Sequence, residues 1–184
     1  KNPDTDTICS AMVEEILNRK NGWETKAVRL GNLNKETQYV LNYLGLEAPE
    51  LIEKVEEGQE VLLVDHNEFT QSVEGIEKAK IEAVVDHHRI NNFQTSEPLF
   101  YYAQPVGCTA TILLELFKAN NIEIEPKIAG LIPGLLIPGT EFVDIYRGFD
   151  IIKKLSTELC NNGFEDIKFF PTKVELFLTA KAKK

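Results

Sequence analysis

The sequence predicts an α/β protein built on a doubly wound, mostly parallel sheet. Short β-branched runs, such as residues 60–65 and 81–86, alternate with stretches that carry apolar residues at helical spacing. This alternation is typical of parallel strands joined by helices that cover both faces of a sheet. Both runs end in an aspartate followed by histidine. Because such folds bind ligands at the carboxyl ends of their strands, we expect a site there.

The composition is that of an ordinary globular protein and limits the classes of function. The chain has 184 residues, 43% of them hydrophobic and 27% charged, enough for one domain or one domain with a partial second. The net charge of −9 argues against a nucleic-acid surface, and no apolar run is long enough to span a membrane. Three widely spaced cysteines, Cys9, Cys108 and Cys160, suggest no disulfide framework and favour a cytoplasmic location.

The first half of the chain begins with a polar loop that contains Pro3. Apolar residues at helical spacing then predict a helix over residues 7–21, with Asp6 as its N-terminal cap. The elements expected next are a strand at 24–30, helices at 35–44 and 49–57, a strand at 60–65, a short helix at 74–80 and the strand that ends at Asp86.

The second half continues this pattern as far as residue 127. A strand at 99–103 precedes a long helix over 107–120, and a buried helix then begins at residue 127. Pro133-Gly134 and Pro138-Gly139 should break this helix, because an internal proline removes a backbone hydrogen bond and clashes with the preceding turn.

Beyond these breaks the sequence predicts a helix at 151–159 and a strand at 174–178. These residues are too few for a complete second domain. We therefore expect one domain over residues 1–149, followed by a tail over residues 150–184.

Acidic residues and histidines gather at the expected strand ends and loop starts. Asp4 and Asp6 lie in the first loop, Asp65 ends one strand, and His87 follows another. Carboxylates with imidazole suit Mn²⁺, Co²⁺, Zn²⁺ or Fe²⁺. Asp4 and Asp6 could each bind one of two ions, Asp65 could bridge them, and His87 adds a nitrogen ligand.

Two neighbouring residues extend this site toward a substrate. His88 and Arg89 would face it as charge-assisted donors to phosphate. Each cluster alone also has a structural explanation, since an Asp-Thr-Asp sequence before a helix is often only a cap. All three clusters fall at strand ends, with every histidine of the chain nearby. Together they favour the metal site.

Several motifs, in the right order over about residues 1–131, resemble the family II inorganic pyrophosphatases, the manganese-dependent members of the DHH phosphoesterase superfamily. The resemblance implies a DHH-type N-terminal domain whose first strand is missing from this chain. The matching segments are residues 1–11, 28–31, 36–39, 63–68, 86–90, 97–99 and 105–111.

The resemblance implies hydrolysis of inorganic diphosphate at two Mn²⁺ or Co²⁺ ions, with Mg²⁺ arriving with the substrate. By motif position, Asp4 corresponds to a ligand of the first ion, Asp6 and His87 to ligands of the second, and Asp65 to the acid that bridges them. His88 corresponds to a substrate-contacting histidine, so Asp65 and His88 are the catalytic candidates. Members of this family pair as homodimers through this domain, with the active site facing a smaller C-terminal domain.

The chain also departs from the family pattern. The family has a histidine ligand just before the position of Lys1, and an aspartate ligand where this chain has Pro138-Gly139. We therefore expect weak turnover. Two alternatives stay open: another DHH phosphoesterase that acts on short oligonucleotides or a nucleotide phosphate, and a non-catalytic remnant.

Overall fold

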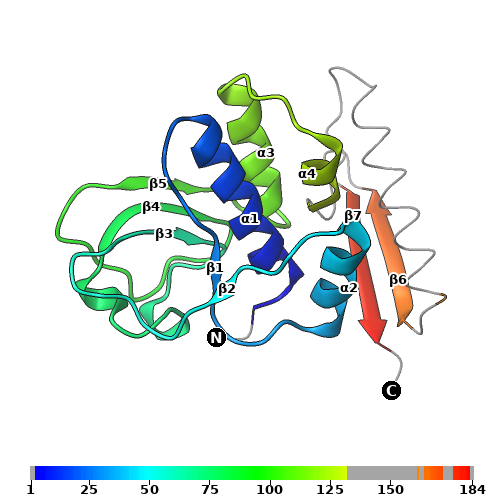
Figure 1. Ribbon diagram of the computed structural model, residues 1–184, viewed down its shortest axis with the longest axis horizontal. Helices are drawn as coiled ribbons and strands as arrows, with labels where there is room; N and C mark the ends of the chain where they lie inside the picture. Colours follow the sequence, from blue (N-terminus) through cyan, green and yellow to red (C-terminus); the bar gives the residue numbers. More distant parts are fainter. Residues whose placement is uncertain (1–2, 132–160, 162–163, 172–175, 183–184) are drawn as a thin grey trace.

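The main sheet has three parallel strands in the order β3-β4-β5 (Figure 1). They are β3 (Glu60–Val64), β4 (Lys80–Asp86) and β5 (Phe100–Ala103). The mostly parallel α/β fold predicted from the sequence is confirmed. The computed structural model describes residues 3–131, 161, 164–171 and 176–182.

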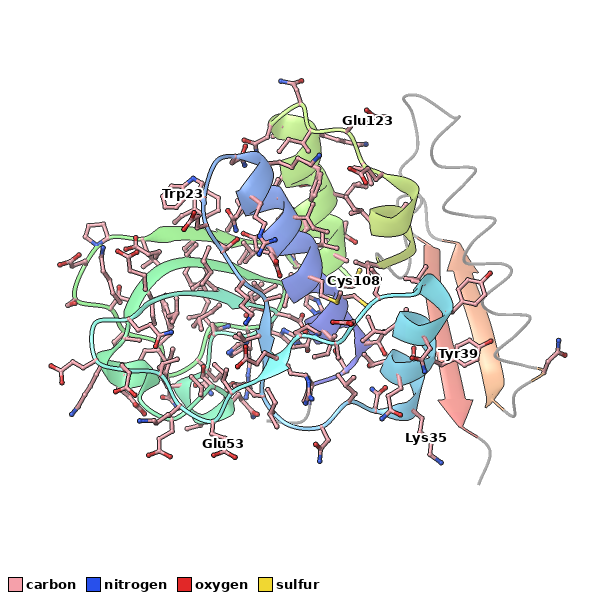
Figure 2. The ribbon with its side chains drawn as sticks, in the orientation of Figure 1. Trp23, Lys35, Tyr39, Glu53, Cys108 and Glu123 are labelled. Carbon is pink, nitrogen blue, oxygen red and sulfur yellow. The ribbon has the colours of Figure 1, made fainter. Side chains whose placement is uncertain are left out.

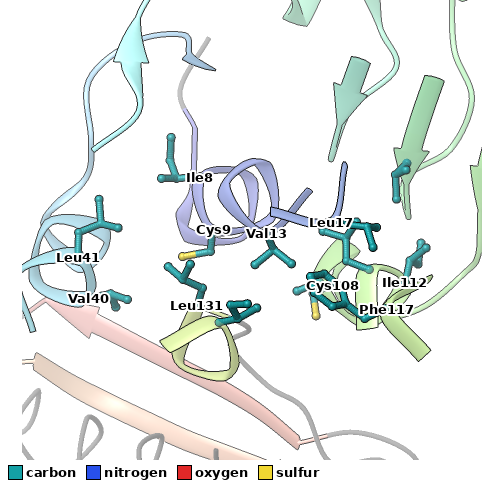
Figure 3. Packing of buried hydrophobic residues seen from close by; sticks show 14 residues of the cluster. Ile8, Cys9, Val13, Leu17, Val40, Leu41, Cys108, Ile112, Phe117 and Leu131 are labelled. Carbon is teal, nitrogen blue, oxygen red and sulfur yellow. The ribbon is translucent and has the colours of Figure 1, made fainter. Parts of the chain in front are cut away.

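Two long helices lie side by side against one face of this sheet (Figure 1). They are α1 (Thr5–Lys20), which contacts β3, and α3 (Thr109–Ala119), which contacts β4. Two shorter helices, α2 (Lys35–Leu44) and α4 (Pro126–Leu131), pack beside α1. Figure 3 shows the apolar core that these helices enclose. Its buried members include Ile8, Val13, Leu41, Ile112, Phe117 and Leu131.

Strand β4 packs against apolar residues on both faces of the sheet, which accounts for the apolar run at its carboxyl end. Val85 packs in the core under the helices, whereas Val84 packs in a second cluster on the other face. That second cluster also contains Leu63 and Ile76. Successive side chains of a strand point to opposite faces, so a strand covered on both sides must be apolar throughout. Two 3₁₀ turns, η1 (Phe69–Gln71) and η2 (Ile76–Lys78), belong to the segment that covers this second face.

The helix predictions hold best where local signals are strong. Helix α2 has the predicted bounds, with Asn34 as its N-terminal cap and Gly45 in the left-handed conformation at its C-terminus. The cap of α1 is Asp4, not Asp6 as predicted. Asp4 has extended backbone angles and accepts a hydrogen bond from the Thr7 amide, whereas Asp6 lies inside the first turn.

Other predictions were wrong or lie outside the described residues. Residues 49–57 were predicted to be helical, but β2 (Glu50–Leu51) pairs in parallel with β1 (Val28–Arg29). Tertiary pairing decides this segment, and the expected strand at 24–30 shrinks to those two residues of β1. Antiparallel β6 (Phe164–Pro171) was not predicted, and its partner β7 (Leu176–Ala182) overlaps the expected strand at 174–178. The predicted helix at 151–159 and both Pro-Gly pairs lie outside the described residues.

The side chains separate into a buried interior and a charged exterior. Figure 2 shows Cys108 in the interior, while Lys35, Glu53 and Glu123 point outward. Cys9 and Cys108 are both buried thiols. Within the described part of the chain, every helix is too short or too polar to cross a lipid bilayer.

A groove of about 800 Å³ runs between α1, β3 and β1. Glu14 of α1 lines it and is 6% exposed. Its Oε1 accepts a hydrogen bond from Asn18, but its Oε2 has no partner among the described residues. Burial therefore raises the pKa of Glu14 above its ordinary value.

We expect Glu14→Gln to raise the free energy of unfolding at neutral pH by about 1 kcal/mol, because it removes a buried charge with an unpaired oxygen. A carboxyl whose pKa is raised by folding stabilises the fold while it is protonated. That contribution is lost as the pH rises through the raised pKa. The advantage of Gln should therefore be small near pH 4 and larger at pH 7, as measured by urea unfolding. Glu57→Gln, at an exposed position, should show no such pH dependence.

Candidate metal centre

The candidate site forms where the carboxyl ends of β3 and β4 meet the amino ends of α1 and α3. Asp65 follows β3, while His87 and His88 follow β4. Asp6 projects from the first turn of α1 toward the first residues of α3. Two strands and two helix termini therefore bring together residues that are more than eighty positions apart in the sequence.

Asp65 lies at the centre of this group. It is 5% exposed and adopts a left-handed backbone conformation with φ of 63°, which aspartate tolerates better than most residues. Its Oδ1 accepts a hydrogen bond from the Thr109 hydroxyl at 2.8 Å, and its Oδ2 lies 2.6 Å from the Thr7 hydroxyl. Burial opposes its ionisation, but hydrogen bonds from His87, Thr7 and Thr109 lower its pKa overall.

Asp6 supplies the second carboxylate and also caps α3 from outside that helix. Its Oδ2 accepts a hydrogen bond from the Thr109 amide at 2.9 Å, and its Oδ1 accepts one from the Ser10 hydroxyl at 2.9 Å. Residue Cys108, at the N-cap position of α3, provides no side-chain cap itself. Burial and the nearby charge of Asp65 raise the pKa of Asp6 to about 7. A cation beside this pair would therefore be favoured.

His87 presents one ring nitrogen to these carboxylates. Its Nδ1 lies 2.9 Å from the Val106 carbonyl and donates to it, which leaves Nε2 directed at the acids. The Nε2 atom lies 3.4 Å from Asp65 Oδ1 and 3.8 Å from Asp6 Oδ2. The hydrogen bond to Asp65 raises the pKa of His87 to about 9. A backbone carbonyl that holds Nδ1–H is the usual arrangement of a histidine that binds a metal through Nε2.

Asp4 reaches the group through Thr7. The Thr7 hydroxyl lies 3.0 Å from Asp4 Oδ1 and 2.6 Å from Asp65 Oδ2. One hydroxyl proton can serve only one of these two carboxylates at a time. Asp4 itself is exposed, so its second oxygen is accessible to a ligand from the groove.

The donor set fits a divalent metal. Ligand atoms of Asp65, His87 and His88 all lie within 4.8 Å of one another. Carboxylates beside an imidazole whose second nitrogen is held by a backbone carbonyl are suited to Mn²⁺ or Co²⁺. Asp4, Asp65, His88 and Arg89 also line the groove, so the site is open to a small ligand.

The sequence model of the DHH family, N-terminal domain, matches residues 1–134. The chain belongs to the DHH family. This match includes every residue of the candidate metal centre.

Named relatives point to one branch of the DHH family. A protein of Oceanobacillus iheyensis is 56% identical over 137 residues, and one of Exiguobacterium sp. is 56% identical over 138 residues. Each is named "Probable manganese-dependent inorganic pyrophosphatase". These alignments cover 74% of this chain but 44% and 45% of the relatives, so the chain spans less than half of their length.

A solved structure shows the same fold. It belongs to a Methanococcus jannaschii protein described as a candidate family II inorganic pyrophosphatase. The two superpose with a TM-score of 0.64 at 36% sequence identity, over 85% of this chain and 53% of the other. The DHH-type α/β fold expected from the motifs is thereby confirmed.

The structure of this DHH domain does not bring every expected residue to the centre. Asp6, Asp65, His87 and His88 converge, and Asp4 joins them through Thr7. The Arg89 side chain is 84% exposed and its Nη2 lies 3.9 Å from Glu68. His66 turns away from the acids, since its Nδ1 lies 3.0 Å from the Val64 carbonyl and its Nε2 3.2 Å from the Ser72 hydroxyl.

Sequence reasoning missed the residues that hold these side chains in place. Thr7 and Thr109 contact Asp65, and the carbonyl of Val106 orients His87. Thr7 and Thr109 lie within the matching motifs, but nothing in the local pattern shows that their hydroxyls meet at Asp65. Their roles depend on packing between α1, α3 and β3.

Proposed function

We propose that this chain carries the metal-binding half of an inorganic diphosphatase, which hydrolyses diphosphate to two phosphates with a pair of Mn²⁺ or Co²⁺ ions. This proposal rests on the contact between Asp65 and His87. The Nε2 atom of His87 lies 3.4 Å from the Asp65 carboxylate, and its Nδ1 is bonded to the Val106 carbonyl. The names of the relatives support manganese and diphosphate over other metals and substrates.

The ligands divide between two ions. Asp4 would bind the first ion, Asp6 and His87 the second, and Asp65 would bridge both. This division agrees with the separate placement of Asp4, on the groove side of Thr7, and of Asp6, on the α3 side. Two such ions, when bound, supply a hydroxide nucleophile and neutralise phosphate oxygens.

The substrate would bind from the groove. His88 is half exposed and lines the groove beside Asp65, so its ring can donate to a phosphate oxygen. The Arg89 side chain is 84% exposed and its guanidinium lies 3.9 Å from Glu68, so the guanidinium can turn to a phosphate oxygen that arrives with Mg²⁺. In this proposal Asp65 and His88 are the catalytic residues, and His88 and Arg89 bind the substrate.

Phosphate release from diphosphate, compared with release from a dinucleotide, tests this function. With Mn²⁺ we expect diphosphate to be the preferred substrate, at a low turnover because Pro138-Gly139 stands where a further carboxylate ligand is expected. Faster cleavage of the dinucleotide would instead support another DHH phosphoesterase. Tight Mn²⁺ binding without hydrolysis of either would support a non-catalytic domain.

We further propose that residues 1–149 form the metal-binding domain and that residues 150–184 form a divergent tail. The family match to residues 1–134 supports the first boundary. Buried thiols at Cys9 and Cys108 suit a reducing compartment, which supports a cytoplasmic location.

We also propose a homodimer formed through this domain. Strand β5 is an edge of the described sheet, and Phe100 on it is 52% exposed. An unpaired edge with an exposed aromatic residue favours pairing with a second copy. Phe100→Glu should convert a dimer to a monomer by light scattering, whereas Tyr43→Glu on α2 should not. A monomeric parent chain would contradict this proposal.

A further inference from the structure

Asn67 is a buried side chain beside the site that makes three hydrogen bonds. It is 1% exposed, and it follows β3 two residues after Asp65. Its amide nitrogen donates to Asp86 Oδ2 at 2.6 Å and to the Arg89 carbonyl at 3.0 Å. Its amide oxygen accepts from the Asn91 backbone amide at 3.0 Å. Two acceptors on one side and a donor on the other determine the orientation of the amide.

Asp86 connects Asn67 to His88 through hydrogen bonds. Asp86 is fully buried, and its Oδ1 accepts hydrogen bonds from the His88 backbone amide at 3.0 Å and from His88 Nδ1 at 2.8 Å. The His88 side chain is 53% exposed, so packing alone does not determine the orientation of its ring. Because a carboxylate accepts, Asp86 favours a proton on Nδ1, and Nε2 makes no hydrogen bond to a described residue.

We infer that Asn67 is a positioning residue, which holds Asp86 so that His88 keeps Nδ1–H bonded to Asp86. In the charged ring, the second proton then lies on Nε2, which can donate to a phosphate oxygen of the substrate. The second N–H bond of Asn67 holds the backbone at Arg89, so one amide fixes both substrate-facing residues. This inference rests on the proposed function for its catalytic consequence, but not for its effect on His88. His87 is held separately by Val106, so the orientation of its ring does not rest on a hydrogen bond from Asn67.

The first test measures the His88 tautomer in metal-free protein by ¹⁵N NMR, at a pH where the imidazole is neutral. The parent should show Nδ1–H. Asn67→Asp places an acceptor against Asp86 Oδ2 in nearly the same volume, so Asp86 should turn and the Nε2–H tautomer should appear. In the double variant N67D/D86N, the amide of residue 86 can donate to the carboxylate of residue 67. The Oδ1 atom of residue 86 can still accept a hydrogen bond from His88. The Nδ1–H tautomer should then return.

The second test separates positioning from stability. Asn67→Asp should lower kcat for diphosphate by about 10- to 100-fold, the usual effect of losing an outer hydrogen-bond partner, while Mn²⁺ affinity changes less than about twofold. Asn91→Ala is the control in the same loop, because it removes only the 3.0 Å bond from Asn91 to Glu68. It should change neither the tautomer nor kcat.

The outcomes distinguish the two proposals. If the His88 tautomer in Asn67→Asp matches the parent, the positioning role is wrong whatever the activity. If the tautomer changes as expected but the parent does not hydrolyse diphosphate, the proposed function fails and the structural role of Asn67 stands. A fall in Mn²⁺ affinity equal to the fall in kcat would show general damage to the site and overturn the inference.

Discussion

Replacing Asp65 with asparagine should reduce Mn²⁺ affinity by about 100-fold or more, the largest effect of any single change to the site. Loss of an outer-shell partner typically costs 10- to 100-fold in metal affinity, and a carboxylate that bridges two ions should cost at least the upper end. Asparagine keeps the side-chain shape and tolerates the left-handed backbone with φ of 63°. The change therefore tests the carboxylate charge and not the turn.

Isothermal titration with Mn²⁺ would measure this loss. His66→Gln is the matched control, because His66 also follows β3 but bonds to Val64 and Ser72 and faces away from the acids. The Mn²⁺ affinity of His66→Gln should stay within about twofold of that of the parent chain. Equal Mn²⁺ affinity in Asp65→Asn and the parent would contradict the assignment of Asp65 as the bridging ligand.

Replacing Gly75 with alanine should produce the largest loss of stability, about 3 kcal/mol, because two costs add at this position. Gly75 has φ of +88°, and a Cβ there would lie 2.5 Å from the Val55 carbonyl oxygen. That oxygen belongs to the backbone, so it cannot swing away as a flexible side chain could. The adjacent Ile76 is buried in the core beneath the sheet, so this clash should also disturb the core packing.

Chemical denaturation of Gly58→Ala separates the two costs. Gly58 has φ of +76°, but nothing lies within 4 Å of its Cβ position, so alanine there should cost about 1 kcal/mol from backbone strain alone. If Gly75→Ala lost no more stability than Gly58→Ala, the close approach of residue 55 would not be a constraint on the fold.

The strands of the main sheet and most helices could be read from local pattern. The local signals that agree with the structure are the apolar runs of β3 and β4, the caps of α2 at Asn34 and Gly45, and the four-residue spacing of Ile8, Met12 and Ile16 in α1. The prediction at residues 49–57 failed because two of these residues pair with strand β1, 22 positions earlier in the chain. No local propensity specifies such a partner.

The sequence by itself predicted the members of the candidate site, because Asp4, Asp6, Asp65 and His87 fall at expected strand ends and helix starts, where a parallel sheet gathers polar groups. It also determined the family, through motifs in order. Only the tertiary structure decided which nitrogen of His87 faces the acids, that Asp6 caps α3, and that Asn67 holds Asp86. These are hydrogen bonds between segments 19 to 103 residues apart, and their geometry exists only once the helices and strands have packed.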